Sequence, residues 1–423
     1  MSVKLLLAGR RDADGNPFSP PEAGKPWLRR ALAWFHEHAE DWLESARMGT
    51  GPHGAPLLRL RLHPAAGEVS ILAASGARVV ISAETSAVGP GYHVFLCDLV
   101  KRLGQELGLT WADADEAAGV GDPTGYFHTG DEGPVEVYML ASLQESVAQV
   151  LRMRRQGESG FGLSMRFGHT FEHPGALLTP LGPRDERWLR NVYEDPRRGM
   201  DVFPWWKPGL HARTRLSRAL CRLWTDVVWR PPLLDEERAL FRDVARLLES
   251  AWREDPSLPY PWREWQEVLG YLGIGGTLAE EVRRRAAGVT GGPPMGYRRG
   301  AVQVALPEGW EIRIPGSLAE AHLQDGTWVA RDHRRSVRFM PLEDGAEESL
   351  APTSAERRAL ELEHHGERVS GRASLHVVPG ECRLTALCSS GRRRALCVVS
   401  FDDPEEQDWA LGTWRSLDHA VAA

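Results

Sequence analysis

The segment His169-Thr-Phe-Glu172-His173 has the residue types and spacing of the zinc-peptidase motif H-x-x-E-H. On a helix, His169 and His173 would lie on one face about 6 Å apart, close enough to share a zinc ion. Glu172 would then act as general base on the metal-bound water. His169 and His173 are therefore candidate metal ligands, and Glu172 and His173 are candidate catalytic residues.

The residues around this motif favour a different local structure. Pro174 disfavours a helical conformation at His173, the residue before it. Gly168 precedes the motif, and Leu163–Phe167 has the composition of a strand. In an extended chain, His169 and His173 would lie about 13 Å apart, too far for one metal ion. A strand that leaves a sheet into a polar turn is the favoured interpretation.

A second candidate site is the segment Gly89-Pro-Gly91-Tyr92-His93, between a predicted strand and a predicted helix. Glycine allows a sharp turn and a close approach to a ligand. The first N–H groups of a helix lack intrahelical partners and suit an anion. Gly89, Gly91, Tyr92 and His93 are therefore predicted ligand-binding residues, and His93 is also a candidate catalytic residue. The alternative is a tight turn with Ser86 or Gly91 near the cap.

Cys97 follows His93 by four residues, a helical spacing at which the imidazole could activate a thiolate. The apolar neighbours of Cys97 favour a buried structural cysteine instead. The polar, glycine-rich loop 111–133 carries further groups that could line a cleft with His93: Asp122, Tyr126, His128 and Asp131.

Hydrophobic periodicity predicts alternating strands and helices in the first 182 residues. The predicted strands lie at the amino terminus and at Leu57–Leu62, Val69–Ala73 and Val79–Ala83, and the predicted helices at Trp27–Met48, Tyr92–Leu107 and Val135–Met153. Residues 183–290 are predicted to form a helical subdomain packed on the first region. It includes a helix Arg213–Val228, one capped by Asp235, and one begun by a Thr277–Glu280 capping box.

The glycine- and proline-rich stretch 287–300 predicts a linker. Residues 301–423 then predict an α+β sandwich. Its expected elements are strands at Ala301–Leu306, Trp310–Ile314, Thr327–Ala330, Ser336–Phe339, Ser374–Val378, Arg383–Ser389 and Arg394–Phe401, a charged helix capped by Thr353 and Glu356, and a closing helix capped by Asp403.

The stretches LPEGWEIRIPG and CVVSFDDPEEQDWALGTWRSL stand near the two ends of this last region. The first resembles the opening strands, and the second the last strand and closing helix, of PsbP/DcrB-like α/β sandwich domains. Members of that superfamily are mostly non-enzymatic and often act as chaperones, adaptors or accessory subunits. The resemblance covers residues 300–420 and implies an interaction role for them; residues 1–300 resemble no known family.

Composition narrows the class of protein. Of 423 residues, 42% are hydrophobic and 26% charged, as in a soluble globular protein. The net charge of -7 does not indicate nucleic-acid binding, and no segment is apolar for long enough to span a membrane. Five cysteines without C-x-x-C spacing predict reduced thiols in the cytoplasm. Nearly all the basic residues are arginine and few are lysine, a bias that suggests a GC-rich bacterial genome.

The sequence therefore predicts an α/β to α+β multidomain protein, with regions 1–182, 183–290 and 301–423. We expect a cytoplasmic bacterial interaction, adaptor or regulatory protein whose partner is another protein. It would serve as an accessory subunit of a larger assembly related to defence or secretion. The alternative is an enzyme, such as a metal-dependent hydrolase, that uses the 169–173 motif or the turn at Gly89–His93. Neither hypothesis names a cofactor.

Overall fold

The computed structural model describes residues 3–11, 24–115, 119–158, 160–163, 165, 169–171, 176–342, 360–378 and 380–419. The chain forms two compact units. The first consists of Met1–Arg166, His173–Trp224 and Val244–Trp265, and the second of Phe167–Glu172, Thr225–Asp243 and Gln266–Ala423. Both units combine helices with antiparallel strands, which confirms the mixed α and β composition. The three-region division stays a prediction.

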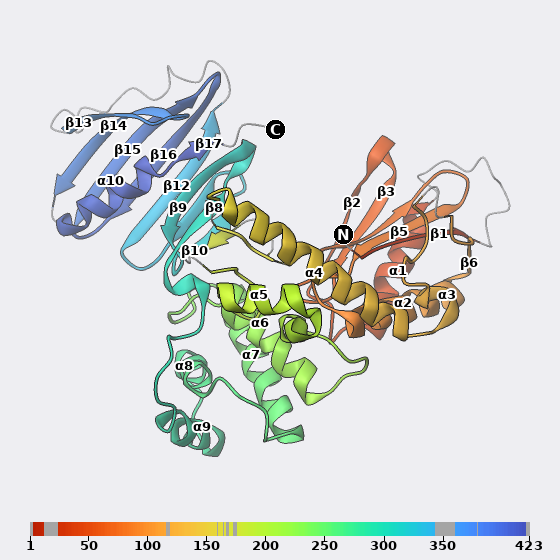
Figure 1. Cartoon of the computed structure of the whole chain (residues 1–423). Coiled ribbons are helices and arrows are strands. Elements are labelled where there is room, and N and C mark those ends of the chain that lie inside the picture. Colours follow the sequence, from red (N-terminus) through yellow and green to blue (C-terminus); the bar gives the residue numbers. More distant parts are fainter. Residues whose placement is uncertain are drawn as a thin grey trace. The chain divides into compact units, whose positions relative to one another are not determined.

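The first unit is built on a six-stranded antiparallel sheet (Figure 1). Its strands, in spatial order, are β2 (Ser45–Thr50), β3 (Pro56–Arg61), β4 (Val69–Ala73), β5 (Arg78–Glu84), β1 (Lys4–Arg11) and β6 (Leu109–Trp111). Alternate residues of β4 and β5 are fully buried. One face of the sheet therefore supplies the core, as the period-2 pattern of the sequence predicts.

Three long helices belong to this unit: α1 (Lys25–His38), α2 (Pro90–Leu107) and α4 (Gly133–Arg155). Phe35 of α1, Leu96 of α2 and Ile81 of β5 belong to one buried core. The predicted helix Trp27–Met48 is too long, because α1 ends at His38. Residues 45–50 instead pair with β3, with Ser45 opposite Arg61, since strand pairing outweighs local helix propensity here.

The segment 183–290 is mostly helical, as predicted. It contains α5 (Glu186–Glu194), α6 (Ala212–Thr225), α7 (Asp235–Glu254), α8 (Trp262–Leu272) and α9 (Thr277–Ala287). Helices α7 and α8 each contribute residues to both units. The capping box predicted for α9 is wrong, because Gly276 occupies the N-cap position and no side chain caps the helix.

The second unit contains a seven-stranded antiparallel sheet and a four-stranded one. The first has the order β10 (Ala319–His322), β11 (Trp328–Arg331), β12 (Arg335–Leu342), β16 (Arg393–Phe401), β15 (Glu381–Ser390), β14 (Ser370–Val378) and β13 (Leu360–His365), and the second the order β17 (Asp418–His419), β9 (Trp310–Pro315), β8 (Ala301–Ala305) and β7 (His169–Phe171). The sequence analysis did not predict strands β10 and β13.

The closing helix α10 (Gln407–Arg415) begins three residues later than predicted, because Asp403 caps the short 3₁₀ helix Pro404–Glu406 and the N-cap residue of α10 is Glu406, which makes no side-chain cap. The Asp403 carboxylate accepts a hydrogen bond from the Glu405 N–H at 3.0 Å. Trp414 lies on the buried face of the helix. The helix predicted at Thr353 and Glu356 lies outside the described residues. Among the residues that are described, no helix is long and apolar enough to cross a membrane.

The GPGYH turn is held by a second segment of the same unit. The Gly91 N–H lies 3.1 Å from the carbonyl oxygens of both Trp205 and Trp206. An added Cβ at Gly91 would lie 2.5 Å from the Lys207 carbonyl oxygen and 2.5 Å from Cδ1 of Trp205. Only glycine therefore allows residues 205–207 to pack this closely on the first turn of α2.

We expect Gly91→Ala to lower the free energy of unfolding by about 2 kcal/mol, because the backbone of residue 207 has to move. Urea unfolding followed by tryptophan fluorescence measures the change. Gly270→Ala, in α8, is the matched control. No atom lies within 4 Å of its added Cβ, so stability should hold or rise by up to about 1 kcal/mol. Equal stability of Gly91→Ala and wild type would contradict this packing.

Candidate functional site

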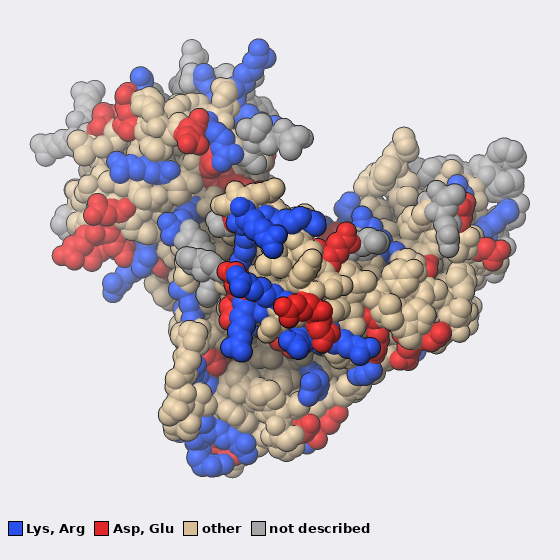
Figure 2. Space-filling view, in the orientation of Figure 1, with Lys and Arg blue, Asp and Glu red and all other residues tan. Residues whose placement is uncertain are grey.

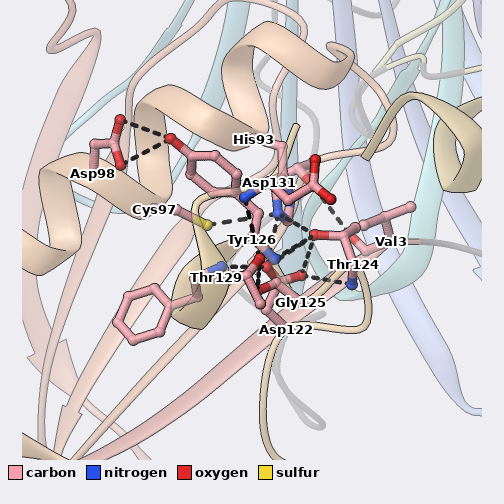
Figure 3. A network of polar contacts seen from close by, with 12 residues as sticks. Val3, His93, Cys97, Asp98, Asp122, Thr124, Gly125, Tyr126, Thr129 and Asp131 are labelled. Carbon is pink, nitrogen blue, oxygen red and sulfur yellow. Dashed lines mark hydrogen bonds and ion pairs between the residues drawn. The ribbon is translucent and has the colours of Figure 1, made fainter. Parts of the chain in front are cut away.

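His93 lies in the first turn of α2, fully buried, at the centre of a polar network (Figure 3). Its Nδ1 lies 2.9 Å from the hydroxyl of Thr85, the residue that follows β5. Its Nε2 faces three groups, at 3.2 Å from Asp122 Oδ2, 3.1 Å from Thr124 Oγ1 and 3.6 Å from Cys97 Sγ. The structure thus brings Cys97 and Asp122 to the same histidine.

Asp122 reaches this position because its loop is tied to the sheet. The Gly121 N–H donates to the Leu6 carbonyl at 2.6 Å, and the Leu6 N–H donates back at 3.0 Å. The carboxylate accepts the N–H groups of Thr124 and Phe127, each at 2.9 Å. Burial would raise the pKa of Asp122, but His93 and these two N–H groups outweigh it and lower the pKa to about 2.

Cys97 is buried and does not have the surroundings of a nucleophile. Burial, and then the Asp122 charge, hold the pKa of its thiol well above the usual value, whereas a reactive cysteine needs a lowered one. Cys97 and Asp122 also face the same ring nitrogen of His93. In a nucleophile–histidine–acid triad they would face opposite nitrogens. The arrangement can hold the loop that carries Asp122 in place, or it can bind a cation. It lacks the geometry that thiolate catalysis requires.

The other three residues of the loop that were predicted to lie near His93 differ in position. Tyr126, in the short helix α3 (Tyr126–Thr129), has its ring centroid 6.4 Å from that of His93 and donates its hydroxyl to Asp98 at 3.1 Å. His128 and Asp131 are exposed. Part of the polar loop therefore packs inward on α2, and part faces solvent.

The proposed ligand-binding turn is filled by protein. Gly89 has φ of 116°, and an added Cβ there would lie 2.8 Å from the Trp205 carbonyl oxygen. The buried ring of Tyr92 lies 6.0 Å from that of Trp205, and burial raises the pKa of its hydroxyl. A ligand bound by Gly89, Gly91, Tyr92 and His93 would have to displace residues 205–207, and that role stays a prediction.

His169, the first residue of the 169–173 motif, belongs to the second unit. His169 is in β7, antiparallel to β8, so its extended conformation is confirmed. Its Nε2 lies 2.8 Å from Glu320, which also accepts from Arg298 at 2.8 Å. Burial would raise the pKa of Glu320, but His169 and Arg298 together lower it. Glu172 and His173 lie outside the described residues, so metal binding or catalysis by the motif stays untested.

A pocket of about 470 Å³ opens elsewhere on the first unit. Its lining comes from the segment after α1, from Leu210 and α6, and from α7. The lining residues are Asp41, Trp42, Leu210, Arg215, Arg218, Arg246, Leu247, Ser250, Arg253 and Glu254. This volume is typical of small-ligand and side-chain pockets. The sequence analysis missed it, because its lining comes from three separate stretches of chain.

The wall of this pocket depends on a buried cluster of three charges. Glu44 accepts hydrogen bonds from Arg218 at 2.6 Å and from Arg222 at 2.5 Å. Arg218 also donates to the Asp41 carbonyl at 2.5 Å, and its guanidinium lies 5.2 Å from the centroid of the Trp42 ring. Burial would raise the pKa of Glu44, but the two arginines lower it below its ordinary value.

Charge on the visible face of the molecule is mixed. Figure 2 shows Lys and Arg gathered over the end of α4, whose last turn carries Arg152, Arg154 and Arg155, with acidic side chains close by over α5. This view gives no uninterrupted basic surface of the kind that tracks a nucleic-acid backbone.

Comparison with known proteins supplies no relative from which a function could be transferred. No protein-family model matches the sequence, and no curated protein matches it significantly.

Removing the charge of Glu44 should be costly. We expect Glu44→Gln to lower the free energy of unfolding by about 3 kcal/mol at pH 7, because two buried arginines lose their counter-charge. Exposed Glu40 provides the control, since Glu40→Gln should change stability by less than about 0.5 kcal/mol. Urea unfolding of both variants makes the comparison, and similar small losses would show that the cluster is not a stabilising one.

The lowered pKa of Glu44 also predicts that the stability of the protein depends on pH in the acid range. A carboxylate whose pKa is lowered by folding contributes stability at pH above its ordinary value, about 4.3. That contribution is lost as the pH falls towards the pKa of the folded state. Between pH 5 and pH 3, roughly, wild type should therefore lose more stability than Glu44→Gln does. Parallel pH profiles of the two proteins would contradict this assignment.

Proposed function

We propose that this protein is a binding protein, an adaptor or regulatory subunit, whose pocket on the first unit receives an acidic segment of a partner protein. The observation that carries the proposal is the composition of the pocket, where four arginines surround Trp42 and Leu247. Arginine and tryptophan are the side chains most enriched among residues that dominate protein–protein binding. The occupant is an acidic stretch that carries one large apolar side chain.

The apolar residues of the pocket are the reason for proposing a large apolar side chain in the partner segment. Leu247 is buried in its wall, whereas Leu210 is 44% exposed at its edge. Trp42 is half-buried and stacks on Trp205, with ring centroids 4.6 Å apart. A side chain placed against such a held ring gains apolar contact without ordering the ring.

The arginines of the pocket are the reason for proposing that the partner segment is acidic. Arg218 is held by Glu44, and Arg215 pairs with Glu254. Arg253 pairs with Glu249 at 2.5 Å, and its side chain is 74% exposed. A guanidinium has five N–H donors in a planar fork, so one carboxylate partner leaves donors that can bind a second. An acidic segment at the rim would engage these groups.

Two further features suit an adaptor better than an enzyme. Substrate would have to reach His93, Cys97 and Asp122, and all three are buried. The resemblance of residues 300–420 to PsbP/DcrB-like domains also suits an accessory subunit. We assign the protein to the cytoplasm, where its five cysteines would persist as the thiols described by the structure.

Site-specific photo-crosslinking in the native host tests this function. A photoreactive phenylalanine analogue replaces Leu210 at the pocket edge, or Val137, which is 66% exposed on α4 of the same unit, as the control. We expect a single protein adduct from position 210 and none of that size from position 137. Mass spectrometry of the adduct should place the crosslink in an acidic segment with a large apolar residue.

A charge reversal at the rim then tests the chemistry. Arg253→Glu should reduce the adduct at least about tenfold, because a like charge would face the acidic segment. Arg242→Glu, in the same helix but outside the pocket lining, should leave it unchanged. An adduct that persists in Arg253→Glu, a crosslink to a basic segment, or native mass spectrometry that finds a small molecule in place of a protein partner would each overturn the proposal.

A further inference from the structure

The buried network around His93 contains three side chains of the types that ligate transition metals. His93, Cys97 and Asp122 each offer one ligand atom, and these atoms all lie within 4.8 Å of one another. Within the described ranges, this is the one group of three or more such side chains placed so closely. The set combines nitrogen, sulfur and oxygen donors, which zinc accepts together.

The separations of these atoms suit one shared ion. Ligands roughly 2.0–2.3 Å from a tetrahedral zinc ion lie roughly 3.3–3.6 Å from one another. His93 Nε2 lies 3.6 Å from Cys97 Sγ and 3.2 Å from Asp122 Oδ2. Cys97 Sγ and a carboxylate oxygen of Asp122 lie within 4.8 Å of each other, so side-chain adjustment would bring all three atoms to bonding distance of the same ion.

The partner of the other imidazole nitrogen orients His93 as a ligand. The Thr85 hydroxyl lies 3.3 Å from the carbonyl oxygen of Val3, to which it can only donate. When it does so, it accepts the proton of His93 Nδ1 at 2.9 Å. Nε2, which faces Cys97 and Asp122, is then free to give its lone pair to an ion bound between them. A second hydrogen bond that fixes the tautomer in this way is the usual companion of a metal-bound histidine.

Charge balance also favours a divalent cation. The Cys97 side chain and the Asp122 side chain are both buried, and a divalent ion held by two anionic ligands would bring no uncompensated charge into this buried site. On metal binding, Cys97 would release its proton and the two anionic ligands would neutralise the ion. Asp122 would keep its hydrogen bonds from the N–H groups of Thr124 and Phe127, whereas its contacts with His93 and with the Thr124 hydroxyl would be exchanged for the bond to the ion.

From this geometry we infer that His93, Cys97 and Asp122 bind one zinc ion. The fourth position falls to a water molecule or to the hydroxyl of Thr124, 3.1 Å from His93 Nε2. All three ligand side chains are buried, so the ion would be shielded from solvent. The ion ties the loop at Asp122 to α2, and the inference is independent of the function proposed for the arginine-lined pocket.

Metal analysis of the full chain tests the inference. Protein refolded with an equivalent of Zn²⁺ and then desalted should retain one zinc per chain. Replacement of zinc by Co²⁺ should produce the charge-transfer absorption of a cobalt–thiolate bond, which reports Cys97 directly and requires no variant. A chelator should lower the melting temperature of the zinc-loaded protein.

Two thiol variants separate this site from other metal binding. Cys97→Ala should lose both the zinc and the cobalt–thiolate band. Cys221→Ala, which removes another buried thiol of the first unit, should keep both. The inference is overturned if the refolded wild type holds no zinc, if its cobalt complex shows no thiolate band, or if Cys97→Ala retains a full equivalent of metal.

Discussion

The burial of Glu44 between Arg218 and Arg222 is the constraint on which the arrangement of the first unit depends. The two arginines are buried and the Glu44 side chain is 13% exposed, so the three charges must be paired, because an unpaired one would cost several kcal/mol. Glu44 lies in the short connection between α1 and β2, and both arginines lie in α6. This pairing therefore fixes a helix from residues 212–225 against a segment more than 160 residues earlier.

The pocket is a consequence of that pairing. Arg218 is held rigidly by Glu44 and by the Asp41 carbonyl, and its guanidinium lies beside the ring of Trp42. Trp42 in turn stacks on Trp205, whose carbonyl oxygen accepts from Gly91 at the start of α2. The aromatic and guanidinium surfaces of the pocket are thus preorganised by contacts that reach into the core.

The network at the start of α2 has a different character. His93 is surrounded by Thr85, Asp122, Thr124 and Cys97, and none of these side chains is exposed. Enclosure suits a structural role, in which the polar groups hold the 119–125 loop against the sheet. It does not suit turnover of a substrate, which needs access to the reacting atoms.

Local sequence patterns were sufficient for most elements of this fold. The alternation in β4 and β5, the apolar stripe of α2 and the Asp403-Pro404 start of the 3₁₀ turn that leads into the closing helix each act within a few residues, so they can be recognised without tertiary contacts. Where long-range pairing decides, the same patterns failed. Residues 45–50 read as the end of a helix but pair with β3, and Gly276 replaces the expected Thr277 cap.

The sequence by itself determined the candidate residues but not their neighbours. His93 stood out from its place at a strand-to-helix turn, and Cys97 from its helical spacing to His93. Asp122 was one of four residues of loop 111–133 expected near His93, and the pairing of Gly121 with Leu6, a contact across 115 positions that leaves no local signal, brings it to the imidazole. The arginine pocket is likewise assembled from three separate stretches. Periodicity records which face of an element is buried, but only the packed chain decides which buried faces and side chains meet.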